Sequence, residues 1–265
     1  MSVYYKEEPS CLREAMDSMF QQTVPPEEFL LVCDGPLNEG LDEVIREELE
    51  LHPDSLRVVR LEENGGLGKA LQRGLKECRN DLVARMDSDD ISLTGRCEKQ
   101  LQYLEEHPEV SIVGGWISEF QSDPAVTYSE RIVPENHKEI VEFSKSRNPF
   151  NHMTVMYRKK DILDVGGYQH FPFLEDYFLW VRLFLKGYRG HNLPENLVCA
   201  RVGNGMIGRR SGMEYARTQK RLFSYMLGKG YITKMQYLKA VTVRTAVSVT
   251  PDSFKELFYK KILRK

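Results

Sequence analysis

The amino-acid sequence predicts an α/β fold with a mostly parallel mixed sheet and a helical extension at its C-terminal end. Across the first 90 residues, short apolar runs typical of buried strands alternate with longer segments of helical periodicity. This alternation indicates parallel strands that are joined by crossover helices. A strongly basic, helical segment begins at residue 209. The chain of 265 residues is long enough for one such domain and an extension.

The first third of the chain contains four expected strands and three expected helices. The strands are 1–5, 29–33, 56–61 and 82–86, and the helices are about 10–20, 40–51 and 67–78. In the first helix, the apolar residues recur at helical spacing and so share one face. Parallel sheets of this kind bind ligands beyond the carboxyl ends of their strands. The residues that directly follow each strand are therefore the first candidates for a site.

The remaining elements are less regular. We expect strands at 110–120 and 153–157, helices at 136–145 and 175–186, and three basic helices at about 211–229, 233–247 and 252–263. The composition changes strongly at residue 209. We therefore expect a domain over 1–208, with halves 1–90 and 91–208, followed by an extension over 209–265.

The net charge of −2 conceals a charge asymmetry. Residues 209–265 contain 14 Lys and Arg against three acids, whereas residues 1–208 contain 23 against 36. An acidic body with a basic extension is expected to face two different partners. Nucleic acid is not expected to be one of them, because no nucleic-acid-binding motif accompanies the basic residues.

Cysteine usage and hydropathy indicate a cytoplasmic protein. The five cysteines form no CxxC pair, which fits reduced thiols better than a disulfide framework or a zinc site. We expect neither a secretory signal nor a membrane-spanning helix, since the longest weakly polar stretch, 240–250, is interrupted by Arg244.

Asp87-Ser88-Asp89-Asp90 forms an acidic cluster between an apolar strand and the helix that contains Arg96. Clustered carboxylates repel one another and are hard to desolvate without a cation. At a strand end they predict a site for Mg²⁺ or Mn²⁺, which prefer oxygen ligands and phosphate. A solvated turn that caps a helix is an equally good interpretation of these four residues taken alone.

The glycine-rich segment 64–70 reads Asn-Gly-Gly-Leu-Gly-Lys-Ala. A phosphate-binding P-loop is excluded by Glu63 and Ala70, and a dinucleotide fingerprint is excluded by Leu71. What remains is a turn into a helix, around Gly66, whose free backbone amides would favour an anion. A simple strand-to-helix loop remains the alternative.

Glu175 and Asp176 open a helix in which Trp180 lies on the apolar side. Carboxylates at a helix N-terminus are stabilised by the helix dipole, so capping alone explains them. The functional alternative makes Asp176 a general base above a cleft. His152 precedes an expected strand, and a lone histidine of this kind is more often a packing or hydrogen-bonding residue than a ligand.

These motifs, in this order, resemble the family 2 glycosyltransferases, which have the nucleotide-sugar-binding GT-A fold. The residues that carry the resemblance span about 1–205 and read, in order, S-V-Y-Y, Q-Q-T, L-L-V-C-D-G, N-G-G-L-G-K-A, V-A-R-M-D-S-D-D-I-S-L, N-H-M-T-V-M-Y-R, G-G-Y and E-D-Y-F-L-W. The chain is most similar to the subgroup that assembles bacterial exopolysaccharide, capsule or O-antigen repeat units, such as the amylovoran-type transferases.

The resemblance implies roles for individual residues. Nucleotide contacts fall on Ser2, Tyr4, Asp34, Gly66 and Asp87, with the first three at the base and Asp87 at the ribose and donor sugar. Asp89 is implied as the ligand of Mn²⁺ or Mg²⁺, and Asp176 as the catalytic base. Glu175, His152 and Trp180 are candidates for contacts on the acceptor or donor side.

The implied reaction is an inverting, metal-dependent transfer of a sugar from a nucleotide-sugar, with UDP as the expected nucleotide, to an acceptor hydroxyl. The half 1–90 is expected to bind the nucleotide and the half 91–208 the acceptor, a saccharide or a lipid-linked saccharide. The basic extension 209–265 would contact the inner face of the cytoplasmic membrane. Its alternative is a solvated basic segment that packs on the acidic body.

The sequence departs from the family pattern at two places, and two rival functions are also compatible with it. Ala70-Leu71-Gln72 stands where relatives often have A-R-N, and Thr94-Gly95 replaces the usual proline before the Arg96 helix. A non-catalytic binding or scaffold subunit at the membrane is the first rival. A sugar nucleotidyltransferase is the second, and it is disfavoured because its N-terminal G-x-G-T/S-R-like loop is absent from the sequence.

Overall fold

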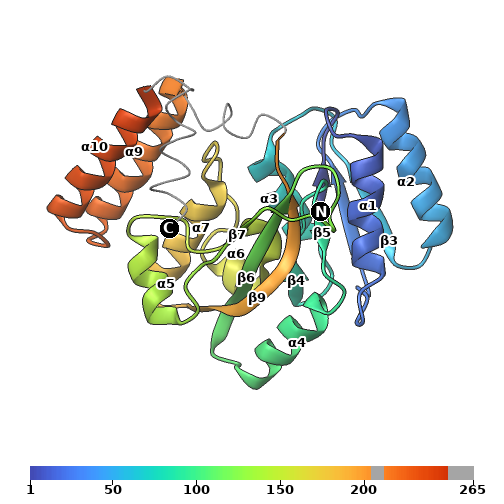
Figure 1. Ribbon diagram of the computed structural model, residues 1–265, viewed down its shortest axis with the longest axis horizontal. Coiled ribbons are helices and arrows are strands. Elements are labelled where there is room, and N and C mark those ends of the chain that lie inside the picture. The colour runs from blue at the N-terminus through green and yellow to red at the C-terminus, as the bar shows by residue number, and fades with distance from the viewer. Residues whose placement is uncertain (204–211, 250–265) are drawn as a thin grey trace.

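The computed structural model describes residues 1–203 and 212–249, and it contains two adjacent sheets with helices packed around them (Figure 1). The first sheet is fully parallel in the order β1–β2–β3, with β1 at Ser2–Val3, β2 at Phe29–Cys33 and β3 at Leu56–Arg60. Its connecting helices are α1 at Pro9–Phe20 and α2 at Glu39–Leu51, and α3 at Leu67–Glu77 leads from β3 to the second sheet. The expected β-α-β-α-β-α order of this region is confirmed.

The second sheet is mixed and has the strand order β4–β8–β6–β9–β5, with β7 paired to β6. The strands are β4 Leu82–Ala84, β5 Ile91–Ser92, β6 Val110–Phe120, β7 Ser129–Arg131, β8 Met156–Arg158 and β9 Arg189–Arg201. Only β6 and β9 pair in parallel in this sheet of the described chain. The expectation that the strand near 82–86 continues the parallel sheet is wrong, because β4 pairs antiparallel with β8.

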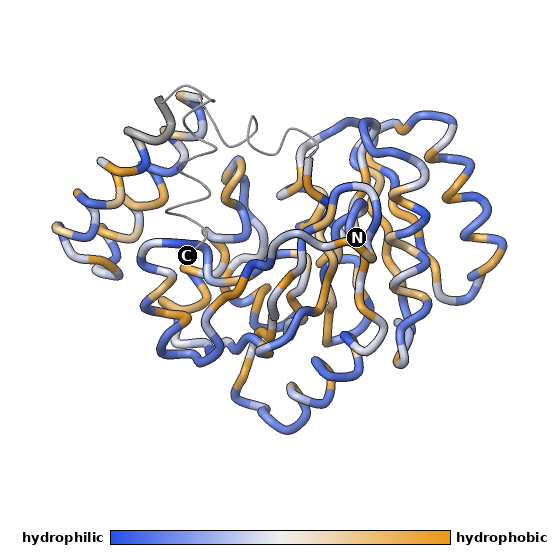
Figure 2. Tube along the Cα trace, in the orientation of Figure 1, coloured by the Kyte–Doolittle hydropathy of each residue, from blue (hydrophilic) through white to orange (hydrophobic). Residues whose placement is uncertain are grey.

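The helices α4 at Arg96–Glu106, α5 at His137–Ser144, α6 at Lys159–Asp164 and α7 at Glu175–Leu185 complete the body. The strand expected at 153–157 is instead a short 3₁₀ turn at His152–Thr154 followed by β8. The long strand β9 was not expected, because Pro194 and polar residues interrupt its apolar pattern. Figure 2 shows the apolar residues concentrated in the strands and on the inward faces of the helices.

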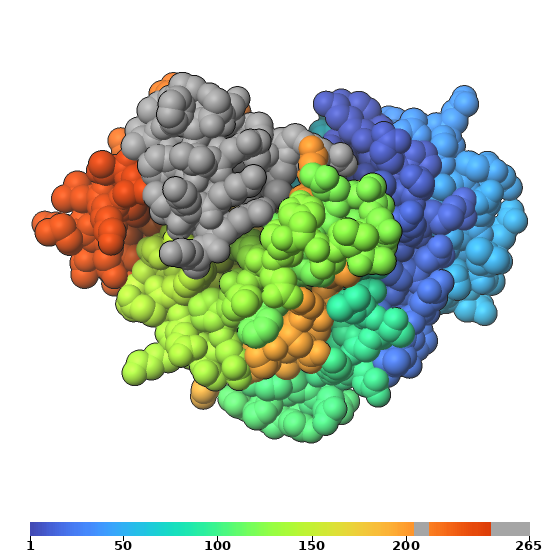
Figure 3. All heavy atoms as spheres, viewed as in Figure 1, coloured from blue at the N-terminus to red at the C-terminus, as the bar shows by residue number. Residues whose placement is uncertain are grey.

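The helices α9 at Gly212–Gly228 and α10 at Lys234–Val249 pack side by side at the opposite end of the molecule from α1 and α2 (Figures 1 and 3). One buried cluster joins α9 to the inner helix α7, with Phe178 and Val181 of α7 against Leu222 and Phe223 of α9. This apolar contact attaches the described part of the basic extension to the body. The helix expected at 252–263 lies outside the described residues.

Candidate active site

The loop that precedes α3 is fastened to the end of β2 by Asp34. The backbone amides of Gly65 and Gly66 donate to its two carboxylate oxygens at 2.8 and 2.9 Å, and the Asn64 side-chain amide donates to its backbone oxygen at 3.1 Å. Gly66 has a φ of 85°, a conformation that glycine adopts without strain. The amides of this turn therefore already have an anion, and the expectation that both are free for a ligand is wrong.

Ser2 and Tyr4 lie beside Asp34 at the same edge of the first sheet. Ser2 is paired with Val32 in the parallel ladder, and the Asp34 amide donates to the Val3 carbonyl at 2.8 Å. Ser2 and Tyr4 are half-buried, whereas Asp34 is only 4% exposed. The structure thus brings together the three residues for which the family resemblance implies contacts with a nucleotide base.

An ion pair links the acidic cluster to a buried arginine. The guanidinium of Arg85 pairs with the carboxylate of Asp87, and Arg85 is only 3% exposed. Its Nε and Nη1 atoms have no hydrogen-bond partner among the described residues. A charge this deep is stable only when it is paired, so Arg85 and Asp87 depend on each other. The sequence analysis assigned no role to Arg85. Its position within an apolar strand, two residues before Asp87, is the feature that could have indicated a buried ion pair.

The other members of the acidic cluster have different surroundings. Ser88 donates from Oγ to a Glu7 carboxylate oxygen at 2.7 Å. Asp90 is 2% exposed and accepts the Arg201 backbone amide at 2.7 Å. Burial and the neighbouring carboxylates of Asp87 and Asp89 raise the pKa of Asp90 well above its usual range. Asp90 is therefore a structural carboxyl, whereas Asp87 and Asp89 are the partly exposed ones.

The donor set fits a hard divalent cation that shares its coordination with a substrate. In the described part of the chain, no group of three or more His, Cys, Asp or Glu side chains converges in a way that could hold a metal by itself. Mg²⁺ commonly binds through one or two carboxylates plus substrate phosphates, and Asp87 and Asp89 supply such carboxylates. The residues present thus fit Mg²⁺ or Mn²⁺ in the presence of a diphosphate.

Asp176 and Glu175 form the N-terminus of α7. One Asp176 oxygen accepts the Asn148 side-chain amide at 2.5 Å, and the other accepts the Tyr177 backbone amide at 2.7 Å. These contacts fix the orientation of the carboxylate. Glu175 is half-buried beside the start of α3, where a Cβ on Gly68 would lie 3.5 Å from its side chain. Burial and the adjacent Asp176 charge raise the pKa of Glu175 to about 7.

His152 and Trp180 face the interior. His152 Nε2 lies 2.9 Å from the Tyr168 hydroxyl, and burial together with the Arg85 charge lowers the pKa of His152 well below its usual range. Trp180 is fully buried against Phe150. Trp180 was a candidate for contacts on the acceptor or donor side, and this prediction is wrong because its side chain is not exposed to a substrate. His152 is a half-buried hydrogen-bonding residue that contacts Tyr168.

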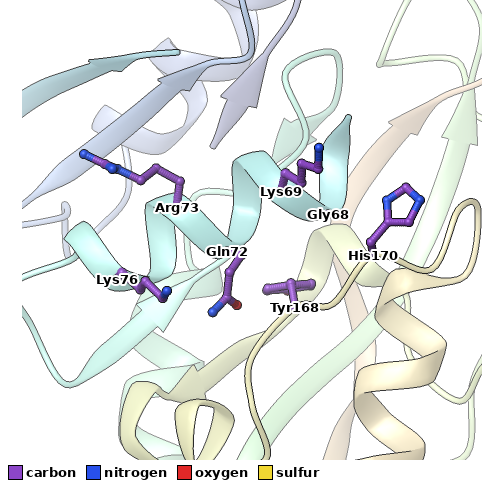
Figure 4. A pocket seen from close by; sticks show the side chains of 7 residues that line it. All are labelled: Gly68, Lys69, Gln72, Arg73, Lys76, Tyr168 and His170. Atoms are coloured by element: carbon purple, nitrogen blue, oxygen red, sulfur yellow. The ribbon is translucent and has the colours of Figure 1, made fainter. Parts of the chain in front are cut away.

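Two neighbouring pockets, each of about 270–280 Å³, open between α3 and the segment that leads to α7. The first is lined by Gly68, Lys69, Gln72, Arg73, Lys76, Tyr168 and His170, and Figure 4 shows that the first five come from α3 and the last two from the neighbouring segment. The second is lined by Gly65, Gly66, Leu67, Gly68, His170, Phe171, Pro172, Phe173 and Glu175. Because Gly68 and His170 line both, the pockets are continuous with the glycine-rich loop and with Glu175.

Comparison with protein families decides the identity of the fold and its class of activity. The family described as Glycosyl transferase family 2 matches residues 2–167. The protein is a family 2 glycosyltransferase. It is 42% identical over 265 residues to an uncharacterized glycosyltransferase of Haemophilus influenzae. The alignment covers 100% of this chain and 98% of the relative.

Two relatives carry more specific names. The amylovoran biosynthesis glycosyltransferase AmsE of Erwinia amylovora is 38% identical over 266 residues, covering 98% of this chain and 97% of the relative. The UDP-Gal:alpha-D-GlcNAc-diphosphoundecaprenol beta-1,3-galactosyltransferase of Escherichia coli is 35% identical over 268 residues, covering 100% of this chain and 95% of the relative.

Solved structures agree with the GT-A fold that the sequence predicts. A mannosyltransferase from Pyrobaculum calidifontis in complex with GDP-Man and Mn²⁺ has a TM-score of 0.66 and 16% identity, covering 98% of this chain and 77% of the neighbour. S. aureus TarS 1–349 in complex with UDP-GlcNAc has a TM-score of 0.66 and 18% identity, covering 98% and 75%. At these identities the likeness establishes the fold, and the α/β GT-A prediction is confirmed.

Proposed function

We propose that this glycosyltransferase moves a sugar from a UDP-sugar to the hydroxyl of a lipid-linked saccharide during assembly of a bacterial surface polysaccharide. The observation that carries the proposal is the placement of Asp34 directly after β2 and of Asp87 and Asp89 in the turn after β4, with Asp176 at the N-terminus of α7. Relatives named for amylovoran synthesis and for galactosyl transfer from UDP-Gal to a diphosphoundecaprenol-linked sugar support the substrate class.

The donor half is residues 1–90. Ser2, Tyr4 and Asp34 would bind the base, and the backbone of Gly66 would line the nucleotide. Asp87, held by Arg85, would contact the ribose and donor sugar. Mn²⁺ or Mg²⁺ held by Asp89 would supply charge neutralisation for the departing diphosphate. The Mn²⁺ in the mannosyltransferase structure supports a divalent requirement.

The acceptor half is residues 91–208. Asp176 would accept the proton of the acceptor hydroxyl as that oxygen attacks the anomeric carbon in line, which inverts the configuration at that carbon. The Asn148 amide holds the Asp176 carboxylate in place for this step. General-base help of this kind is typically worth about 10²–10⁴-fold in rate. Glu175 and the aromatic residues of the second pocket would border the acceptor saccharide.

The extension 209–265 would bring the glycosyltransferase to the inner face of the cytoplasmic membrane, where a lipid-linked acceptor resides. On α10, Met235 and Leu238 are 75% and 58% exposed, and Lys234 and Lys239 flank them. Apolar side chains beside lysines suit an anionic lipid surface. Within residues 1–203 and 212–249, no helix is both long and apolar enough to cross a membrane.

A transfer assay tests the proposal. The purified protein is incubated with Mn²⁺, a panel of UDP-sugars and a synthetic prenyl-diphosphate-linked monosaccharide, and the anomeric configuration of the product is read by NMR. We expect transfer with inversion, and a loss of about 10²-fold or more in kcat for Asp176→Asn with UDP affinity unchanged. Asp54→Asn is the matched control, because Asp54 is an exposed acid that is distant in the sequence from Asp176.

Two results would contradict the proposal. The absence of transfer and of donor hydrolysis with every nucleotide-sugar would favour a scaffold subunit. Formation of a nucleotide-sugar from a sugar phosphate and a nucleoside triphosphate, with release of pyrophosphate, would favour a nucleotidyltransferase.

A further inference from the structure

Arg201 connects the end of β9 to the acidic cluster, 111 residues away from Asp90 in the chain. Its backbone amide donates to an Asp90 carboxylate oxygen at 2.7 Å, and its side-chain Nε donates to the Asp89 backbone carbonyl at 3.0 Å. Two neighbouring residues of the turn are therefore held by one residue of the second sheet. The side chain of Arg201 is only 11% exposed.

The guanidinium of Arg201 is itself fixed from two further directions. Its Nη2 atom donates to Glu14 of α1 at 2.6 Å, and the group lies 4.6 Å from the ring centroid of Phe120 on β6. Arg201 and Phe120 are paired in the β6–β9 ladder. A planar guanidinium with several donors can satisfy such contacts at once, which a lysine ammonium does less well.

The turn that carries Asp89 needs a support of this kind. It lies between the three-residue strand β4 and the two-residue strand β5, which pairs with β9 through Ile91 and Ser92. Asp87, Asp89 and Asp90 repel one another at close range, and this repulsion opposes a compact turn. The Arg201 donor at the Asp89 carbonyl is one contact that fixes the backbone of the residue proposed to hold the cation.

We propose that Arg201 is a positioning residue for the donor site. By holding the Asp89 carbonyl, it orients the Asp89 carboxylate toward the cation and diphosphate. The inference rests on the proposed function, because it assumes that Asp89 is the cation ligand. Partners that orient a metal ligand typically change metal affinity by about 10- to 100-fold when they are removed.

The direction in which Mn²⁺ affinity changes when Arg201 is replaced distinguishes a positioning role from a purely electrostatic one. A guanidinium beside a cation site repels the cation, so a purely Coulombic role predicts tighter Mn²⁺ binding after Arg201 is neutralised. A positioning role predicts weaker binding after the same substitution. A role limited to folding predicts a lower melting temperature with no change in the Mn²⁺ requirement.

The experiment measures thermal stabilisation by UDP as Mn²⁺ is titrated, using wild type, Arg201→Met and Arg201→Lys. We expect Arg201→Met to need about 10-fold or more Mn²⁺ for half-maximal stabilisation, and Arg201→Lys to need an intermediate amount. Arg189→Met is the matched control, since Arg189 is an exposed arginine at the opposite end of β9. It should behave as wild type.

Amide hydrogen exchange without metal gives a second readout. The segment 87–92 should exchange faster in Arg201→Met than in wild type or in Arg189→Met, because the turn has lost its hydrogen bond to Asp89. This measurement does not depend on turnover or on a bound nucleotide.

The outcomes are distinguishable. An unchanged or lower Mn²⁺ requirement in Arg201→Met, while wild type responds to Mn²⁺ and UDP, overturns the positioning role and leaves the proposed function intact. Unchanged exchange at 87–92 also overturns it. If wild type shows no Mn²⁺-dependent stabilisation, the proposed donor site fails and this inference fails with it.

Discussion

Arg85 and Asp87 form an ion pair in which the arginine is buried and the aspartate reaches the surface of the site. The side chain of Asp87 is 29% exposed and that of Arg85 is 3% exposed. The pair therefore connects the interior of the second sheet to the proposed donor site. Removing one partner of such a pair leaves an uncompensated buried charge, which commonly costs about 3–5 kcal/mol.

The first prediction concerns the stability that this pair provides. Asp87→Asn should lower the free energy of unfolding by about 3 kcal/mol, because the Arg85 charge loses its anionic partner. Urea denaturation measures the change. The exposed acid Asp54 supplies the control, and Asp54→Asn should stay within about 0.5 kcal/mol of wild type. Equal stability of the two variants would show that Arg85 does not depend on Asp87.

The second prediction concerns Asp34 and the loop before α3. Asp34→Ala leaves the Gly65 and Gly66 amides without their acceptor, so the unfolding free energy should fall by about 1–3 kcal/mol. UDP affinity should fall as well, because the loop borders the proposed nucleotide site. Glu63→Ala, at an exposed acid of the same loop, is the control. A stable Asp34→Ala variant with wild-type UDP affinity would contradict both parts.

The third prediction concerns pH and Glu175. Its pKa is raised from 4.5 to about 7 in the folded protein, so the folded state binds the proton more tightly than the unfolded state does. Stability should therefore decline as the pH rises from about 4.5 to about 7 and level off above that range. The Glu175 contribution to this decline is at most about 3 kcal/mol.

A comparison with Glu175→Gln isolates the contribution of Glu175 ionisation to stability, because glutamine stays neutral at every pH. The unfolding free energy of wild type minus that of Glu175→Gln should be lower at pH 8 than at pH 5. The same difference at both pH values would show that Glu175 titrates normally in the folded protein.

The sequence predicted those parts of the fold that depend on local pattern. The β-α-β-α-β-α order of the first sheet, the strand β6 and the helix α7 all follow from hydrophobic periodicity. The pairing of β4 with β8 could not be predicted, because a short strand presents the same apolar residues to a parallel or an antiparallel neighbour. The strand β9 was missed because Pro194 breaks its pattern while its long pairing with β6 holds it in place.

The candidate site was predicted where the sequence places carboxylates next to strand ends. The contacts of Arg201 with Asp89 and Asp90 join residues more than 100 positions apart, and no local pattern indicates them. Likewise, the amides of the glycine-rich turn were expected to be free, and only the fold brings Asp34 to them. Trp180 could be placed in the core from its helical spacing, but its complete burial is a tertiary property.

The most direct test of the account is the melting temperature of the protein with UDP, with and without Mn²⁺, in wild type and Asp89→Ala. A ligand that binds only the folded state raises the melting temperature by mass action. We predict that UDP stabilises wild type in the presence of Mn²⁺ and that Asp89→Ala abolishes the Mn²⁺-dependent part. Stabilisation by UDP that is equal in both proteins, or absent from both, would contradict a metal-dependent donor site at Asp89.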